Sequence, residues 1–339
     1  MKKRILIIKT TSLGDVLHTL PAVSELLLYS SNITIDWVVE DSFSEIVEWH
    51  PGINRIWKVS IRKWRRNLFS LNTWKQILNF VRSIRSEKYD LVIDAQGLFK
   101  SALILLLIRS NKKYGLDYAS AREGWVSIFY KNKIEVKKGE HAIFRTKSLF
   151  GKAFGYEPDY SNFSSNIEHN WVNNDSHDNT IVFLHGTTWK TKHWPDQYWR
   201  ELAILLVKRG YKIYLPWGSD LEKSRAIKIS DGEENIKVLD KLTLSQLAFI
   251  LTNSALVVSV DTGLSHLTAA CNTPIISIYG PTSSQLTGSM GMKSHFFSSD
   301  LSCAPCFKKK CIISDSQFPP CLNHIKPREI YDKCIGMLL

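Results

Sequence analysis

Short apolar stretches alternate with helical stretches along the chain, and the alternation runs through the sequence twice. Predicted strands lie at residues 4–8, 33–39, 53–59 and 91–94, and again at 181–185, 211–216, 237–239, 256–260 and 275–279. Predicted helices lie between them, at residues 15–28, 74–85, 195–209, 222–229, 244–252 and 266–271. Strands that alternate with helices in this way form parallel sheets from βαβ units. We therefore predict an α/β fold with two Rossmann-like, doubly wound domains.

A polar stretch separates the two halves of the pattern. Residues 160–180 contain many Asn, Ser, Asp and His residues and little apolar periodicity. The length of 339 residues also suits two domains of about 150 residues each. We predict an N-terminal domain at residues 1–165 and a C-terminal domain at 166–325. Ligands of such sheets bind beyond the carboxyl ends of the strands, so a cleft between the halves is the expected site.

The charge of the chain favours an anionic partner. Lys and Arg number 44 against 32 Asp and Glu, which gives a net charge of +12. Nucleic acid, an acidic membrane surface and a phosphorylated substrate all fit this excess. No apolar run reaches the ~18 residues of a membrane-spanning helix, and the N-terminal run ends at Lys9, too early for a signal peptide. We expect a cytoplasmic protein with reduced cysteines.

The first predicted strand runs into the motif Lys9-Thr10-Thr11-Ser12-Leu13-Gly14-Asp15, which opens the first helix. Gly14 permits a tight turn, and the start of a helix favours a negative charge. Asp15 would stay ionised there and could accept a proton from a hydroxyl nucleophile. The alternative is that Asp15 only caps its helix. The motif is neither a Walker A loop nor a Gly-x-Gly-x-x-Gly fingerprint.

A dense basic run, Arg62-Lys63-Trp64-Arg65-Arg66, follows the strand predicted at 53–59, and Arg122 could join it. One compact patch suits a small polyanion. A nucleic-acid groove would need cations spread along the surface and several stacking aromatic residues. The alternative is a solvated basic loop, which is the usual role of a charge run.

Two strand-to-helix turns in the second half could hold phosphate. One comprises His185-Gly186-Thr187-Thr188 and Lys192-His193-Trp194-Pro195, and the other is Asp261-Thr262-Gly263-Leu264-Ser265-His266. Hydroxyls, backbone N–H groups at a helix start and one lysine together bind phosphate. The alternatives are a polar connection, and a capping Asp261 with His266 packed against the sheet. A serine hydrolase is not expected, because the chain has no Gly-x-Ser-x-Gly motif.

Four of the six cysteines are clustered near the C-terminus. Cys303, Cys306, Cys311 and Cys321 have the spacing C-x2-C-x4-C-x9-C around a run of three lysines. Cysteines with this spacing could bind zinc or an iron–sulfur cluster, although the last two cysteines do not form a C-x2-C pair of their own. The alternative is a thiol-containing loop near the cleft. Cys271 and Cys334 lie in apolar helical contexts and are expected in the core.

Taken together, these motifs resemble those of the lipopolysaccharide heptosyltransferases, which are GT-B glycosyltransferases of family 9. The resemblance runs over most of the chain. The matching stretches are residues 9–21, 36–40, 61–65, 94–98, 192–195 and 258–270. The basic run and Arg122 favour the branch that adds the first heptose to Kdo over the branch that adds the second heptose.

The resemblance implies a role for each motif. Asp15 would be the catalytic base. Ser12 and Gly14 of the same turn would belong to the acceptor site. The acceptor's carboxylates and phosphate would be bound by Arg62, Lys63, Arg66 and Arg122. Thr187, Thr188 and Lys192 would hold the donor diphosphate and Glu222 the ribose. The donor site would be completed by Asp261, Thr262, Gly263 and His266. The sequence departs from the family pattern at Lys63, where Arg would offer a bidentate fork, and in the cysteine-rich segment.

The implied reaction is one inverting displacement that moves L-glycero-D-manno-heptose from ADP-L-glycero-β-D-manno-heptose to Kdo–lipid A. No metal and no cofactor are expected, and nucleic acid is not an expected partner. The protein would work peripherally on the cytoplasmic face of the inner membrane. In a GT-B fold the two domains face a central cleft, and residues 326–339 are expected to form a helix that packs back towards the N-terminal domain. A related enzyme with another donor or acceptor, an inactive nucleotide-sugar binder and a basic nucleic-acid-binding protein are the competing hypotheses.

Overall fold

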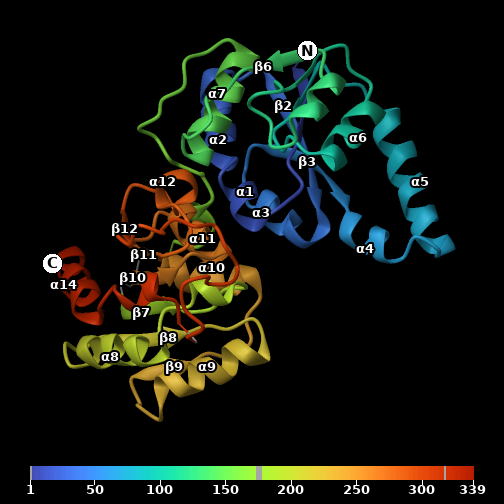
Figure 1. Cartoon of the computed structure of the whole chain (residues 1–339). Helices are drawn as coiled ribbons and strands as arrows, with labels where there is room; N and C mark the ends of the chain where they lie inside the picture. The colour runs from blue at the N-terminus through green and yellow to red at the C-terminus, as the bar shows by residue number, and fades with distance from the viewer. Residues whose placement is uncertain (1, 173–177, 317) are drawn as a thin grey trace. The chain divides into compact units, whose positions relative to one another are not determined.

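The computed structural model describes residues 2–172, 178–316 and 318–339 (Figure 1). The chain divides into two compact units, Met1–Ile167 and Glu168–Leu339. The division lies within the polar stretch at 160–180, of which residues 173–177 lie outside the described residues.

The first unit contains one six-stranded sheet in the order β3-β2-β1-β4-β5-β6, and every neighbouring pair is parallel. Its strands are β1 Lys3–Ile8, β2 Ile33–Glu40, β3 Ile53–Val59, β4 Leu91–Asp94, β5 Lys113–Leu116 and β6 Asn132–Ile134. The first four were predicted. The short strands β5 and β6 were missed, because four and three residues carry too little apolar pattern to stand out.

Helices cover both faces of this sheet. They are α1 Leu13–Leu17, α2 Leu20–Tyr29, α3 Ser44–Glu48, α4 Ile61–Arg66, α5 Leu71–Ser86, α6 Phe99–Leu107 and α7 Ala142–Phe154, with 3₁₀ turns η1 Asp41–Phe43 and η2 Gly124–Phe129. The single helix predicted at 15–28 was wrong, since the structure has α1 and α2 there. Pro21 cannot donate a helical hydrogen bond, but it is tolerated in the first turn of a new helix.

The second unit repeats the topology of the first. Its sheet has the order β12-β11-β10-β7-β8-β9, again all parallel, so the first and fourth strands of each unit lie side by side. The strands are β7 Asp178–Leu184, β8 Lys212–Leu215, β9 Ile236–Val238, β10 Ser254–Val260, β11 Ile275–Tyr279 and β12 Ser294–Ser298. The helices are α8 Asp196–Val207, α9 Asp220–Ser230, α10 Leu244–Thr252, α11 Gly263–Ala270, α12 Ser284–Thr287, α13 Pro320–Asn323 and α14 Pro327–Leu338, with 3₁₀ turns η3 Glu168–Asn170 and η4 Lys190–Lys192.

The strand order shows where the predicted motifs lie in each sheet. The order of connection reverses between β1 and β4 in the first unit and between β7 and β10 in the second. Ligands of doubly wound sheets bind beyond the carboxyl ends of the strands at such a switch point. The turns after β1 and β4 therefore form one candidate site, and the turns after β7 and β10 form another.

The C-terminal helix belongs to the second unit. Helix α14 packs on α8 and β10, and its buried Ile330, Tyr331 and Cys334 join the apolar core that includes Trp194. The helix expected at 326–339 is present as α14, and its packing towards the N-terminal domain stays a prediction. Cys271 and Cys334 are buried as predicted, and burial raises the pKa of each thiol to about 12.

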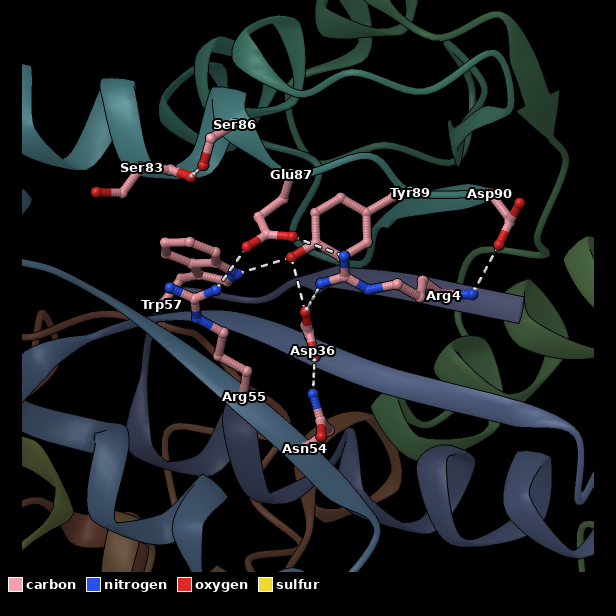
Figure 2. Close-up of polar contacts among 10 residues, drawn as sticks. All are labelled: Arg4, Asp36, Asn54, Arg55, Trp57, Ser83, Ser86, Glu87, Tyr89 and Asp90. Atoms are coloured by element: carbon pink, nitrogen blue, oxygen red, sulfur yellow. Dashed lines mark hydrogen bonds and ion pairs between the residues drawn. The ribbon is translucent and has the colours of Figure 1, made fainter. Parts of the chain in front are cut away.

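A buried polar network joins β1, β2, β3 and the segment before β4, and Figure 2 shows its members. Asp36 lies in the middle of β2 and is almost fully buried. Its carboxylate accepts hydrogen bonds from the Tyr89 hydroxyl at 2.8 Å, the Arg4 guanidinium at 3.0 Å and the Asn54 amide at 2.9 Å. The Trp57 indole donates to the same Tyr89 hydroxyl at 2.8 Å. Arg4 stands at the start of β1, so the network lies away from the switch point and serves stability.

Removing the central carboxylate should destabilise the first unit. In Asp36→Ala, three donors lose their acceptor inside the protein, and we expect the free energy of unfolding to fall by about 2–4 kcal/mol. Urea denaturation measures this loss. Glu48→Ala, which removes the exposed ion pair of Glu48 with Lys58, is the matched control and should cost less than about 1 kcal/mol. Equal losses in the two variants would contradict the assignment.

Candidate functional site

The turns after β1 and β4 are tied together by their polar side chains. Buried Lys9 donates from Nζ to the carbonyl of Ala95 at 2.8 Å. The side-chain oxygen of Gln96 accepts the backbone N–H groups of Thr10 at 3.0 Å and Thr11 at 3.1 Å. These contacts join residues 85 or 86 positions apart, which the parallel pairing of β1 with β4 makes neighbours.

Asp94 holds the second of these turns in shape. Its fully buried carboxylate accepts the backbone N–H groups of Gln96 at 2.9 Å and Gly97 at 3.2 Å. It also accepts the hydroxyls of Ser101 and Tyr130, both at 2.8 Å. Burial raises the pKa of Asp94, while these hydrogen bonds act in the opposite direction. Asp94 therefore positions Gln96 and has no access to a substrate.

Asp15 is partly exposed at the start of α1. Its Oδ2 accepts the backbone N–H and the hydroxyl of Ser12, both at 2.8 Å, which completes a capping box. Burial raises the pKa of Asp15, but the charge of Lys9 and the two bonds from Ser12 outweigh it and hold the pKa below its ordinary value. Both capping bonds go to Oδ2, so capping is compatible with proton acceptance through Oδ1. With its pKa held low, Asp15 is ionised at neutral pH, and its role as a base stays a prediction.

Cations surround this carboxylate. Lys100, near the start of α6, donates to the hydroxyl of Thr11 at 2.5 Å. Burial lowers the pKa of Lys100, and the nearby charges of Arg62 and Arg122 lower it further. The charges of two predicted acceptor residues, Arg62 and Arg122, thus lie close enough to Lys100 to act on its pKa. Lys100 was not predicted as a site residue, although it lies two residues after the motif at 94–98.

The basic run at 62–66 lies in helix α4. The buried carboxylate of Glu40 accepts the backbone N–H groups of Ile61 at 3.3 Å and Arg62 at 3.0 Å, which fixes the start of α4. Trp64 faces inward, where its indole donates to Gln76 at 3.1 Å. Arg62, Lys63, Arg66 and Arg122 are exposed. The guanidinium of Arg62 lies over the Phe43 ring, 5.7 Å from its centroid.

The turns after β7 and β10 meet in the second unit. Lys192 forms an ion pair with Asp261, with 2.6 Å between Nζ and Oδ2. The Thr187 hydroxyl donates to the carbonyl of Asp261 at 3.2 Å. Thr282, which follows β11 and was missed by the sequence analysis, donates to the Asp261 carboxylate at 2.5 Å. Thr188 is exposed in the first turn.

Helix α11 begins at this junction. Thr262 is its N-cap residue, Gly263 is its first residue, and His266 is buried one turn later. The backbone N–H groups of a helix start favour an anion. The predicted donor residues from both turns therefore lie at one switch point.

Glu222 lies against the first turn. Its Oε2 accepts the backbone N–H groups of Gly218 at 2.8 Å and Ser219 at 3.1 Å, which caps α9. A Cβ added at Gly186 would stand 2.5 Å from Oε1 of Glu222, closer than packed atoms approach. Gly186 is therefore required for Glu222 to occupy this place.

Arg225 stabilises the same turn through hydrogen bonds. It donates to the carbonyl of His185 at 2.7 Å and to the carbonyl of Trp194, and it pairs with Asp196. Burial lowers the pKa of Arg225. Burial also lowers the pKa of the His185 imidazole to about 3, and the charge of Arg225 adds to this effect. His185 is thus neutral and has a structural role.

The four clustered cysteines line one small cavity of about 20 Å³. All four are free thiols, and burial raises the pKa of Cys321 to about 11. Within residues 2–172, 178–316 and 318–339, no group of three or more His, Cys, Asp or Glu side chains is arranged to hold a metal ion. The cysteine-rich loop contacts the turn after β7. Thr191 of this turn donates to the carbonyl of Lys308 at 2.9 Å. Lys192 of the turn and Lys309 of the loop both lie over the Trp189 ring.

The chain has two doubly wound α/β units, and each carries polar residues at the switch point of its sheet. The family model of glycosyltransferase family 9 (heptosyltransferase) matches residues 77–316, and the chain belongs to this family. The protein is therefore a glycosyltransferase. No helix in the described part of the chain is long and apolar enough to cross a membrane.

Relatives of known name are similar over most of the chain. Lipopolysaccharide heptosyltransferase 1 of Pseudomonas aeruginosa is 40% identical over 348 aligned residues, covering 99% of this chain and 98% of the relative. Lipopolysaccharide heptosyltransferase 1 of Escherichia coli K12 is 43% identical over 290 residues, covering 85% of this chain and 91% of the relative. The structure of E. coli heptosyltransferase WaaC with ADP matches at a TM-score of 0.87 and 37% identity, covering 98% of this chain and 99% of that one. A second WaaC structure contains ADP-2-deoxy-2-fluoro heptose and matches at a TM-score of 0.86 over the same shares.

Proposed function

We propose that the protein transfers L-glycero-D-manno-heptose from ADP-heptose to the Kdo sugar of Kdo–lipid A, in the assembly of the lipopolysaccharide inner core. The observation that carries the proposal is the Asp15 carboxylate at the switch point of the first unit, where the charges of Lys9 and Arg122 help to hold its pKa low and Lys100 bonds Thr11 of the same turn. The names of the relatives support the reaction, and the nucleotide and nucleotide-sugar analogue in the WaaC structures support the donor.

The second unit would bind the donor. Lys192, Thr187 and Thr188 would hold the diphosphate, beside Asp261, Thr262, Gly263 and His266, and Glu222 would bind the ribose hydroxyls. Negative charge develops on the departing ADP, and a lysine, hydroxyls and the backbone N–H groups at the start of α11 would stabilise it. These groups supply the electrostatic stabilisation without a metal.

The first unit would bind the acceptor and supply the base. Arg62, Lys63, Arg66 and Arg122, joined by Lys100, would hold the carboxylate and phosphates of the acceptor beside the turn with Ser12 and Gly14. The acceptor hydroxyl attacks the anomeric carbon as the bond to ADP breaks, and its proton passes to Asp15. A carboxylate of low pKa is a weak base, so proton transfer accompanies formation of the new C–O bond. The donor is β-linked, and one displacement gives an α-linked heptose.

The expected place of this reaction is the cytoplasmic face of the inner membrane, with peripheral attachment. A net charge of +12 supports attraction to an acidic leaflet. The cations described above are concentrated around one carboxylate, which favours a small polyanionic acceptor over nucleic acid.

An acceptor panel tests the proposed function. Purified protein is incubated with ADP-heptose and each of three acceptors: lipid A without Kdo, Kdo–lipid A, and Kdo–lipid A that already carries one heptose. We expect mass spectrometry to show one added heptose on Kdo–lipid A alone. Addition only to the acceptor that already carries heptose would assign the protein to the second-heptose branch and contradict the proposal.

Gly186→Ala should weaken donor binding without unfolding the protein. The new Cβ displaces the Glu222 carboxylate, and loss of its hydrogen bond to the ribose is expected to raise the KM for ADP-heptose about 10- to 100-fold. Gly218→Ala is the matched control, since its Cβ would stand 3.4 Å from Oε2 of Glu222, an ordinary contact distance. Steady-state kinetics at saturating acceptor measures the difference. A similar KM in both variants would show that Glu222 does not bind the donor.

A further inference from the structure

One segment of the first unit has a charge unlike the rest of the chain. Residues 49–86 contain nine Lys and Arg residues and no Asp or Glu. Two of the nine, Arg55 and Lys58, form ion pairs with Glu87 and Glu48. The other seven are exposed, and none of them takes part in an ion pair within the described residues. The segment therefore presents a concentrated positive charge to its surroundings.

The same segment exposes large apolar side chains. Between the end of α4 and the middle of α5, Leu68, Phe69, Leu71, Trp74 and Leu78 are all at least 48% exposed, and Phe69 is completely exposed. Single exposed apolar residues are normal on a protein surface, but five within eleven residues form a patch. Figure 1 shows α4, α5 and their connection along one side of the first unit.

Helical spacing arranges α5 into two faces. Leu71, Trp74 and Leu78 follow one another at intervals of three and four residues, so they share the outer face of the helix. Arg82 and Arg85 continue the same face in its last turns. The other face carries the buried Thr73 and Ile84. The outer face is thus apolar at its start and cationic at its end.

We propose that the α4–α5 region, residues 62–78, is a membrane-docking surface for an acidic phospholipid bilayer. Leu68, Phe69 and Leu71 enter the interfacial layer of the bilayer, while the cations of α4 contact anionic headgroups. Apolar side chains beside unpaired Lys and Arg are the combination that binds anionic lipid surfaces. The net positive charge of the segment supplies the charge complementarity with this partner.

This docking surface adjoins the proposed acceptor site. The inference therefore rests on the proposed function, and it says where the membrane that carries the lipid acceptor would contact the protein. Helix α4 has six residues and is about 9 Å long. Arg62 in its first turn acts electrostatically on Lys100, which bonds Thr11 in the turn that leads to Asp15. The last turn of α4 leads directly to Leu68. A bilayer at residues 68–71 would therefore present its headgroups to the acceptor site of the same unit.

Vesicle binding tests the surface without any transfer reaction. Wild-type protein is sedimented with vesicles of phosphatidylcholine alone and of phosphatidylcholine with phosphatidylglycerol. The triple variant Leu68→Ser/Phe69→Ser/Leu71→Ser should bind the acidic vesicles at least tenfold more weakly, with unchanged thermal unfolding. The matched control, Leu28→Ser/Ile227→Ser/Met292→Ser, removes three exposed apolar residues elsewhere and should bind like wild type. Equal binding by wild type and the first variant would overturn the proposal.

Two further measurements separate docking from other roles. The kcat/KM of the Leu68/Phe69/Leu71 variant should fall for Kdo–lipid A in vesicles and stay unchanged for a soluble Kdo acceptor without acyl chains. An equal fall for both acceptors would place these residues in the reaction site and overturn the proposal. Conversion of a wild-type dimer to a monomer, with vesicle binding unchanged, would identify the patch as an interface between copies and also overturn it. Because sedimentation needs no heptose transfer, failure of the proposed function would be seen separately.

Discussion

Replacing Asp15 by Asn is expected to lower kcat for heptose transfer about 10³-fold, the largest effect of any single substitution considered. Asn keeps the shape of the side chain and can still accept the backbone N–H of Ser12, so α1 keeps its cap. It cannot accept the proton of the acceptor hydroxyl, and general bases contribute roughly 10²- to 10⁴-fold. Single-turnover kinetics with saturating ADP-heptose and Kdo–lipid A measures the change.

Two controls show whether the loss of kcat comes from loss of the base. The affinity for ADP-heptose should stay within about twofold of wild type, because the donor residues belong to the second unit and the substitution removes none of them. Ser12→Ala removes one hydrogen bond from the Asp15 carboxylate but leaves the base in place, and it should cost less than tenfold in kcat. If Asp15→Asn kept more than a tenth of the wild-type kcat, Asp15 would not be the base.

Lys192→Met should give the second large effect, a fall in kcat/KM of roughly 10²- to 10³-fold. The ammonium group of Lys192 lies at the meeting point of the two donor turns, 2.6 Å from Asp261, where the charge of the departing ADP would develop. Losing one group that stabilises developing charge in a transition state commonly costs this much. The comparison of kcat with KM shows whether the loss falls on the chemical step or on donor binding.

Lys190→Met is the matched control for this substitution, because Lys190 is an exposed lysine of the same 3₁₀ turn and is expected to be close to wild type. A double variant, Lys192→Met/Asp261→Asn, separates two explanations. If the loss came only from leaving the Asp261 carboxylate without its partner, the double variant would regain activity. The account predicts no recovery, since the missing charge is needed by the donor.

The sequence was sufficient to predict most of the sheet and the local motifs. Strands at 33–39 and 53–59 and the helix at 244–252 were confirmed almost to the residue, because their apolar periodicity is strong and local. The turns at 9–15 and at 261–266 were recognised because each follows a buried strand. The α/β class was confirmed by two parallel six-stranded sheets.

The contacts that assemble the sites could not be predicted in the same way. Lys9 reaches Ala95, and Lys100 reaches Thr11, because β1 pairs with β4 on the side away from β2. Likewise Thr282 reaches Asp261 through the pairing of β10 with β11. Glu40 caps α4 from 21 residues away. Periodicity gives the element types but not the strand order, so residues brought together by that order carry no local signal.

The central claim is that one ionised carboxylate, Asp15, drives a single inverting displacement of ADP. The anomeric configuration of the new heptose tests this claim most directly, because the number of displacements decides it. The product formed from ADP-L-glycero-β-D-manno-heptose and Kdo–lipid A can be deacylated, and the one-bond carbon–hydrogen coupling at the heptose anomeric carbon measured by NMR. The account predicts an α-linked heptose. A β-linked heptose would mean retention and would contradict it.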